Sequence, residues 1–267
     1  MKKITRTLCF VALLVTAFSA RTNAQNIMVS LAGSGTGQYT GDGGMGFMSQ
    51  VYSPTDVCAD AAHNIYIADN GNGVVRKISA KDGVITTYAG GGASTADGVP
   101  ATSAALSPAY MCIDAAGNLY MSTGNQVRVV SAATGLITTV AGTGTAGYSG
   151  DGGLANAANL NQPGGICLDA AGNIYVVDGG RAVWSGSGSL PTYIRKITAA
   201  TGIITTIAGT STPGYSGDGG LATAAQIQSS IAICVNAAGD IYFSDQPGAL
   251  SFGGGGLSSG RSAVAQA

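Results

Sequence analysis

The chain lacks most of the side chains that enzymes use for catalysis. It has 267 residues, of which 9% are charged, and it contains no glutamate and a single histidine, His63. General acid–base catalysis relies mainly on His, Glu and Asp, and catalytic metal sites rely largely on His and Glu ligands. All 13 acidic residues are aspartates. The composition therefore argues against an enzyme.

Basic residues are also scarce, and they gather at the N-terminus. Lys2 and Lys3 precede an apolar run from Leu8 to Phe18 and a polar stretch that ends at Ala24, a layout typical of a secretory signal peptide. We expect residues 1–24 to be removed, which leaves eight basic and thirteen acidic side chains and a formal charge of −5. This charge disfavours nucleic acid as a partner. No run approaches the roughly 20 apolar residues of a membrane span, so we expect a secreted or periplasmic protein.

A repeated motif organises the rest of the chain. The segment Asp60–Tyr66, with the sequence DAAHNIY, returns three times in closely similar form. A cysteine stands two residues before each copy, which gives periods of 54, 55 and 67 residues. The copies are 114–120, 169–175 and 236–242, and the cysteines are Cys58, Cys112, Cys167 and Cys234. The chain thus contains four units.

Each unit contains four short runs rich in β-branched residues. In the third unit they are 165–169, 174–177, 193–197 and 203–207, separated by Gly- and Asn-containing turns. Such runs are typical of antiparallel strands joined by hairpins. Four-stranded units repeated along a chain predict an all-β fold, a β-propeller.

The order of residues within a unit resembles the NHL repeat. The third unit reads PGGICLD from Pro163, then GNIYVVD from Gly172, then IRKI from Ile194. The segment Tyr215–Ala222, YSGDGGLA, resembles the longer-period variety found in bacterial exported proteins and in the extracellular part of teneurins. The resemblance covers residues 26 to about 246 and implies a propeller of four NHL-type, four-stranded blades over residues 25–246.

The two ends of the repeat region leave two interpretations open. Residues 27–33 match the fourth strand of a unit, so an N-terminal strand is expected to complete the last blade and close a ring. After Asp245, however, the expected Ile-Arg-Lys-Ile strand is missing, and residues 247–267 read as a disordered Gly/Ser-rich tail. The alternative, which we favour, is an incomplete or truncated part of a larger propeller.

The connections predict where a ligand would bind. In a four-stranded meander the second-to-third connections and the connections between blades lie on one face, which we call the loop side. Asp69 and Asp178 end second strands there, and an insertion in the third unit contains Arg181, Trp184 and Tyr193. Loops that depart from a repeat often carry function, and Trp and Arg are enriched at recognition sites. The competing interpretation is a length variation in which Trp184 covers a neighbouring blade.

The Gly-Asp-Gly-Gly loops are candidate metal sites. Asp42, Asp151 and Asp218 occupy them, and aspartate oxygens are ligands for calcium. One aspartate per loop supplies few ligands, and Asp beside Gly also stabilises turns by binding nearby backbone amides. We therefore expect a turn role and no cofactor, with calcium as the alternative.

The cysteines and the histidine are expected to be structural. The four cysteines of the units occupy equivalent places in successive blades, farther apart than the roughly 7 Å between Cα atoms that a disulfide allows. They are predicted to be small buried thiols. His63 stands where other copies have a turn glycine, so it is expected to be a turn residue.

These features support three functional hypotheses. The first is a binding or scaffold module for an extracellular or periplasmic protein or glycan, which uses the loop side. The second is a degenerate enzyme, because six-bladed propellers that resemble this architecture include lactonases and lyases. The third is a calcium-stiffened structural or sensor repeat of a larger exported protein. The shortage of His and Glu favours the first.

Overall fold

The structure, a computed structural model, describes residues 28–179, 191–245 and 261–265. The predicted signal peptide, residues 1–24, lies outside these ranges, as do Arg181 and Trp184. The described residues form antiparallel sheets joined by turns and short 3₁₀ helices. Within the described ranges, no helix is both long enough and apolar enough to cross a membrane.

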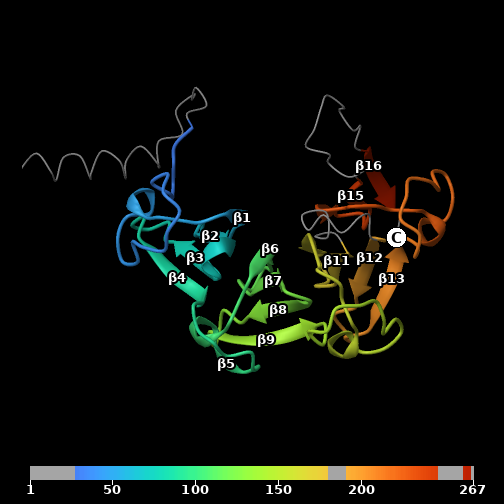
Figure 1. Ribbon diagram of the computed structural model, residues 1–267, viewed down its shortest axis with the longest axis horizontal. Coiled ribbons are helices and arrows are strands. Elements are labelled where there is room, and N and C mark those ends of the chain that lie inside the picture. Colours follow the sequence, from blue (N-terminus) through green and yellow to red (C-terminus); the bar gives the residue numbers. More distant parts are fainter. Residues whose placement is uncertain (1–27, 180–190, 246–260, 266–267) are drawn as a thin grey trace, which may run out of the picture.

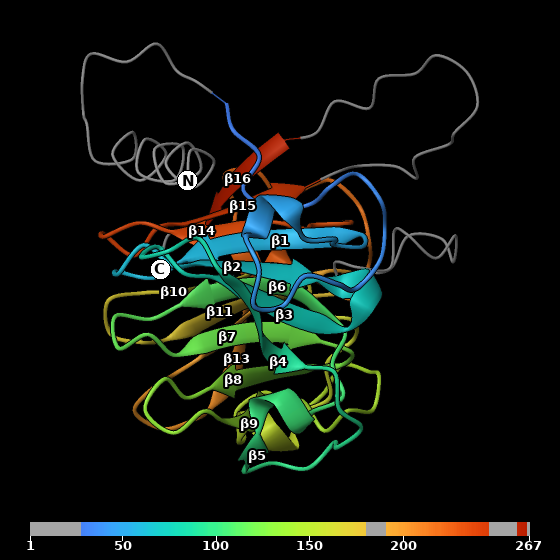
Figure 2. The ribbon, with the colours of Figure 1, turned by 90° about the vertical axis from the view of Figure 1, so that its left-hand side faces the viewer.

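The first two units form one sheet each. The strands of the first sheet follow in chain order: β1 (Pro54–Ala59), β2 (Ile65–Asp69), β3 (Val74–Ile78) and β4 (Ile85–Gly90). Figure 2 shows these strands side by side. The second sheet has the order β5-β9-β8-β7-β6, built from β5 (Val99–Pro100), β6 (Pro108–Ile113), β7 (Leu119–Thr123), β8 (Gln126–Val130) and β9 (Leu136–Ala141).

The last two units repeat the pattern. The third sheet contains β10 (Ile166–Leu168), β11 (Ile174–Asp178), β12 (Tyr193–Ile197) and β13 (Ile204–Ala208). The fourth contains β14 (Ile233–Val235), β15 (Ile241–Asp245) and β16 (Arg261–Ala265). The 3₁₀ helices are η1 (Gly46–Met48), η2 (Asn70–Asn72), η3 (Ala101–Ser103), η4 (Ala155–Ala157) and η6 (Ala222–Ala224).

The four sheets follow one another along an arc (Figure 1). The strand that precedes the repeated motif in each unit contacts the same strand of the next unit: β1 contacts β6, β6 contacts β10, and β10 contacts β14. The hydrophobic core lies between successive sheets: Ala68 and Val75 of the first sheet pack in one cluster with Met111 and Leu119 of the second. Two further clusters join the second sheet to the third and the third to the fourth. The predicted propeller architecture is confirmed.

The N-terminal segment does not close a ring. Residues 28–33 contain no strand, and the side chain of Met28 is 97% exposed. The segment passes η1 of the first sheet instead, because a Cβ added at Gly46 would lie 2.5 Å from the carbonyl oxygen of Leu31. Figure 1 shows why: the first and fourth sheets lie at opposite ends of an open arc. The ring-closing strand predicted from residues 27–33 is therefore not present.

The structure also differs from the sequence-based prediction in the C-terminal tail. Residues 261–265 were placed in a disordered segment, but the structure pairs them as β16 with β15, with Ala263 opposite Phe243. Without β16, the edge of β15 would carry a row of unpaired N–H and C=O groups, which favours the addition of a strand. The five residues lack the Ile-Arg-Lys-Ile pattern, so motif comparison missed them. Residues 246–260 lie outside the described ranges.

In the first three sheets, the loop that precedes the sheet in the chain covers its outer edge. Gly43 donates its N–H to Ile85 O (2.9 Å), and Ile85 donates to Gly44 O (2.9 Å). The third sheet repeats the pair, because Gly152 donates to Ile204 O (2.8 Å) and Ile204 to Gly153 O (3.0 Å). In the second sheet the same cover is the short strand β5, whose Val99 lies opposite Ile137 of β9.

Candidate binding site on the loop side

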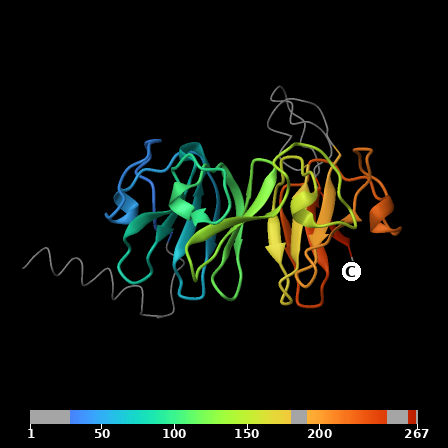
Figure 3. The same ribbon diagram turned by 90° about the horizontal axis from the view of Figure 1, so that it is seen from below.

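Two kinds of connection meet on the loop side, as predicted. The backbone N–H of Gly71, in the β2–β3 connection, donates to Tyr52 O (2.9 Å), and Asn72 Nδ2 donates to Gln38 O (3.1 Å). Gly179 after β11 likewise donates to Asn161 O (2.8 Å). Figure 3 shows the short hairpin turns gathered along the opposite rim of the arc.

In the first and third sheets, a buried aspartate at the end of the second strand ties the preceding inter-sheet segment to the sheet. Asp69 accepts the backbone N–H of Tyr52 (2.7 Å), and Asp178 accepts that of Asn161 (2.6 Å). Both are buried, at 0% and 1% exposure. Thr123 takes this position in the second sheet, where its Oγ1 accepts the N–H of Ser107 (2.9 Å). The two predicted ligand-binding aspartates thus serve the fold.

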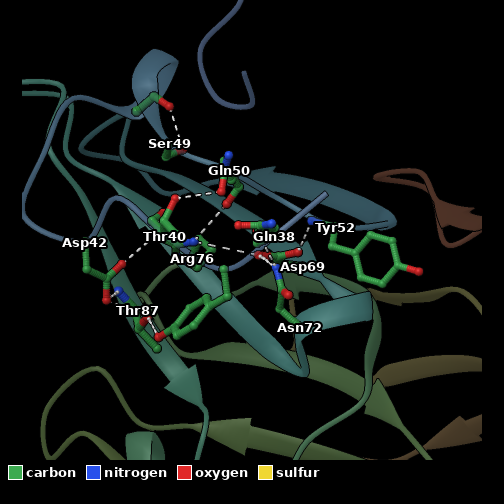
Figure 4. Close-up of polar contacts among 12 residues, drawn as sticks. Gln38, Thr40, Asp42, Ser49, Gln50, Tyr52, Asp69, Asn72, Arg76 and Thr87 are labelled. Atoms are coloured by element: carbon green, nitrogen blue, oxygen red, sulfur yellow. Dashed lines mark hydrogen bonds and ion pairs between the residues drawn. The ribbon is translucent and has the colours of Figure 1, made fainter. Parts of the chain in front are cut away.

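A buried arginine organises the loop above the third and fourth strands of a sheet. Arg76 of β3 and Arg195 of β12 are fully buried. Arg76 lies 2.5 Å from Asp42 Oδ1 and also donates to the backbone oxygen of Thr40 (Figure 4). Arg195 lies 2.6 Å from Asp151 and 3.3 Å from Asp178.

The pKa values of the two carboxyl groups beside Arg195 are shifted in opposite directions. Burial raises the pKa of Asp178 to about 6, although the Asn161 N–H and Arg195 act to lower it. For Asp151, partial burial acts to raise the pKa, but hydrogen bonds from Arg195 and Thr206 outweigh it and lower the pKa below its usual value. Exposed Asp151 therefore stays charged beside the guanidinium, and Asp178 has the weaker tendency to ionise.

The three candidate metal ligands are not brought together. Asp42, Asp151 and Asp218 precede the first, third and fourth sheets, and the first two carboxylates bind arginine. Among the residues that the structure describes, no group of three or more His, Cys, Asp or Glu side chains could hold a metal ion. Asp42 and Asp151 instead hold their loops to the sheet through Arg76 and Arg195, and the predicted hydrogen bonds to backbone amides nearby in the sequence are not among their contacts in the described residues.

Three exposed tyrosines at matching places in the loops were not predicted from the sequence. Tyr39, Tyr148 and Tyr215 each stand three residues before a loop aspartate, and they are 47%, 44% and 50% exposed. The signal was available, because tyrosine recurs at this one place in three of the four units.

The rings of Tyr148 and Tyr39 are fixed by contacts with the sheet beneath them. The hydroxyl of Tyr148 lies 2.8 Å from Thr206 Oγ1 and donates to Asp151 Oδ2 (3.1 Å), and its ring centroid lies 4.9 Å from the guanidinium carbon of Arg195. Tyr39 repeats the arrangement, with its hydroxyl 2.6 Å from Thr87 Oγ1 and its ring 5.1 Å from the Arg76 guanidinium. Cation–π contact and hydrogen bonding together hold each ring in one orientation.

In the third sheet the tyrosine borders a small cavity. The Tyr148 and Tyr193 rings stack with centroids 3.8 Å apart. A cavity of about 90 Å³ beside them is also lined by Asn161, Asp178 and Pro191. Two predicted ligand-binding residues, Asp178 and Tyr193, therefore lie together, whereas Asp69 belongs to the first sheet. Arg181 and Trp184 fall in residues 180–190, outside the described ranges.

The cysteines and His63 supply no evident chemistry. Cys58, Cys112, Cys167 and Cys234 are free thiols, as predicted, although Cys234 is exposed and the others are half-buried. Burial raises the pKa of Cys58 and of Cys167 to about 12, so both thiols stay protonated. His63 has a φ of 64°, which confirms its turn position.

Comparisons with known proteins agree with the architecture. No protein-family model matches the chain. An aligned stretch of 132 residues is 39% identical to teneurin-1 of Gallus gallus, covering 42% of this chain and 4% of that protein. Of the solved structures, an auxiliary nutrient binding protein of Bacteroides thetaiotaomicron has 17% identity and a TM-score of 0.50, covering 69% of this chain and 43% of that one.

A second solved structure gives the same result. An auxiliary nutrient binding protein of Bacteroides ovatus has 13% identity and a TM-score of 0.50, and the match covers 73% of this chain and 46% of that one. The chain spans less than half the length of each of these relatives. At these identities, likeness to the two structures concerns the fold, and function must be argued from the site.

Proposed function

We propose that this chain, which is an NHL-type repeat β-propeller, is an exported binding module that contacts a glycan or a protein through the tyrosines of its loop side. The observation that carries the proposal is the exposed set Tyr39, Tyr148 and Tyr215, at 44% to 50% exposure, in which the rings of Tyr39 and Tyr148 are fixed over buried arginines. A ring held in place loses little conformational entropy on binding, which is why rigid aromatic side chains are favoured in binding surfaces.

The same contacts support binding rather than catalysis. The arginines and aspartates of the first and third sheets bind one another, so their charges are used to stabilise the loops. Asp178, whose pKa is raised to about 6, is 1% exposed and accepts hydrogen bonds from Asn161 and Arg195. A general base must reach the proton that it removes. We therefore propose a protein without enzymatic activity.

A glycan is the partner to test first, because the C–H face of a sugar ring packs flat on an exposed aromatic ring. Residues 25–267 would be run by affinity electrophoresis against a panel of soluble neutral and acidic polysaccharides. For any polysaccharide that retards the protein, we expect Y39A/Y148A/Y215A to weaken affinity at least about tenfold, since each aromatic contact contributes about 0.5–1.5 kcal/mol.

The matched control is Tyr242→Ala. Tyr242 is also exposed, at 37%, but it lies in β15 rather than in an inter-sheet loop, so its removal should leave affinity unchanged. Circular dichroism would establish that the triple variant keeps its sheets. Retardation of the folded triple variant equal to that of the parent would refute the role of the tyrosines, and failure of the whole panel would refute the glycan form of the proposal.

A further inference from the structure

The inter-sheet loop of the second unit is shorter than the other three. In the other units the loop aspartate stands nine positions after the glycine at the end of the preceding fourth-strand motif, as Asp151 does after Gly142. In the second unit, Asp97 stands only seven positions after Gly90. The shortened loop contains no tyrosine. The second sheet therefore lacks the ring that covers its neighbours.

The hydrogen bonds of the arginine identify the residue that replaces the tyrosine. Arg195 donates to the backbone oxygen of Ser149, the residue after Tyr148. Arg128 of the second sheet donates to the backbone oxygen of Ala96, the residue after Thr95 (2.9 Å). Thr95 thus occupies the place of the tyrosine, with a side chain that lacks the aromatic ring.

A hollow lies where the ring is missing. Its volume is about 320 Å³, and its lining includes Thr95, Asp97, Gln126, Thr139, Thr143 and Asn156. This volume falls at the lower end of the roughly 300–1,000 Å³ range of small-molecule sites. The hollow is open to solvent, and the missing ring accounts for a part of this space that is large enough to hold another aromatic ring.

The hydrogen-bonding partners of the missing hydroxyl are still present. In the third sheet, Tyr148 bonds Thr206 and Asp151, and Thr206 lies opposite Arg195 in the strand register. In the second sheet, Thr139 lies opposite Arg128 in the same register. Thr139 Oγ1 donates to Asp97 Oδ1 (2.9 Å), so its lone pairs are available to accept from an O–H donor.

One side of the hollow is formed by the residue that matches Tyr193 of the third sheet. Tyr148 stacks on Tyr193, which stands two residues before Arg195 in β12. The residue two before Arg128 is Gln126, and its planar amide lines the hollow, with Nε2 donating to Gly142 O (3.3 Å). A ring in the hollow would lie against this amide as Tyr148 lies against Tyr193.

We propose that this hollow binds a phenolic group, with the hydroxyl on Thr139 and Asp97 and the ring against Gln126. Among the described residues that line the hollow there is no lysine or arginine, and Arg128 behind it is 2% exposed and paired with Asp97. A neutral phenol therefore fits better than an anion. The phenol belongs either to a small molecule or to a tyrosine side chain of a partner protein.

The test uses residues 25–267 and three probes: p-cresol, N-acetyl-L-tyrosinamide and glucose. Saturable binding would be measured by ligand-observed NMR and calorimetry. We expect at least one phenol to bind, Thr95→Tyr to abolish binding by refilling the hollow, and Thr139→Val to weaken it about three- to tenfold through loss of one hydrogen bond. If N-acetyl-L-tyrosinamide binds at least as well as p-cresol, the partner is a protein; if p-cresol binds more tightly, the partner is a small molecule.

The matched control is Thr138→Val, the same substitution one position earlier on β9, where the side chain is exposed on the opposite face. It should leave phenol binding unchanged, as should Y39A/Y148A/Y215A, so failure of the polysaccharide test does not affect this one. The inference is overturned if neither phenol binds saturably, if Thr95→Tyr binds as the parent does, or if glucose alone binds and Thr95→Tyr abolishes it.

Discussion

The second and third sheets solve the same structural problem with different amounts of polar contact. In both, an arginine on the penultimate strand holds the preceding loop through an aspartate, Asp97 or Asp151. The third sheet adds a second carboxylate, Asp178, and a tyrosine cover, whereas the second sheet has Thr123 and Thr95 in those places. Arg128 nevertheless stays 2% exposed. The common requirement is thus one arginine–aspartate pair, and the additional groups are free to vary.

The largest expected loss of stability comes from removing the arginine of each sheet, which tests the importance of the second carboxylate in the third sheet. Arg195→Met leaves buried Asp178 without its cation, and removal of one partner from a buried pair typically costs about 3–5 kcal/mol. Arg128→Met leaves only Asp97, whose side chain is 50% exposed and can be solvated, so we expect a smaller loss of about 1–2 kcal/mol. Urea denaturation of the two variants measures both losses, and equal losses would contradict the comparison.

Asp178 should make the third sheet sensitive to pH. Burial raises the pKa of this carboxyl to about 6 from an ordinary value of 3.8. Its contribution to stability is therefore fully present below about pH 4 and is lost as the pH rises through 6. Asp178→Asn lacks this titration, so its stability relative to the parent should increase between pH 4 and 7. Thermal melting at intervals of half a pH unit tests this, and a constant difference would show that Asp178 has an ordinary pKa.

The tyrosine cover should matter less than the arginine. Tyr148→Ala removes a stacked ring, a cation–π contact and two hydrogen bonds at a half-exposed site, for an expected loss of about 1–2 kcal/mol. Thr95→Ala at the matching place in the second sheet should change stability by less than about 0.5 kcal/mol. Denaturation midpoints compare the two, and a larger loss at Thr95 would show that the loop alignment is wrong.

The smallest effect concerns a turn in which the first sheet is the exception. His63 has a φ of 64°, and the matching Gly117 of the second sheet has a φ of 85°. The left-handed region costs a residue with a Cβ about 1 kcal/mol, so His63→Gly should stabilise the protein by about that amount. Gly117→His is the reciprocal variant and should lose a similar amount. The melting temperature should move in opposite directions, and the same direction for both would argue against backbone strain.

The repeat made the fold predictable, because strands, turns and their order recur with a regular spacing. The placement of Asp69 and Asp178 at the ends of second strands was also readable from the sequence. Their burial was not, since it depends on hydrogen bonds to Tyr52 and Asn161, 17 residues earlier in the chain. The pairs Arg76–Asp42 and Arg195–Asp151 join positions 34 and 44 residues apart, so no local pattern reveals them.

The hollow in the second sheet was hidden for a different reason. It results from a residue that the repeat leaves out, and its walls come from two loops and two strands. Alignment of the units shows the missing tyrosine, but only the structure shows that no neighbouring side chain fills the space. The strand β16 was missed because its residues lack the motif that defines third strands elsewhere.

The cover that the preceding loop gives to the outermost strand of each of the first three sheets bears on how such chains change in evolution. An exposed outer edge recruits other strands and promotes aggregation, but here every complete unit encodes the segment that covers its edge. Duplication or loss of a whole unit in the gene would therefore add or remove an edge together with its cover. A change in the number of blades would then not leave an uncovered outer edge behind.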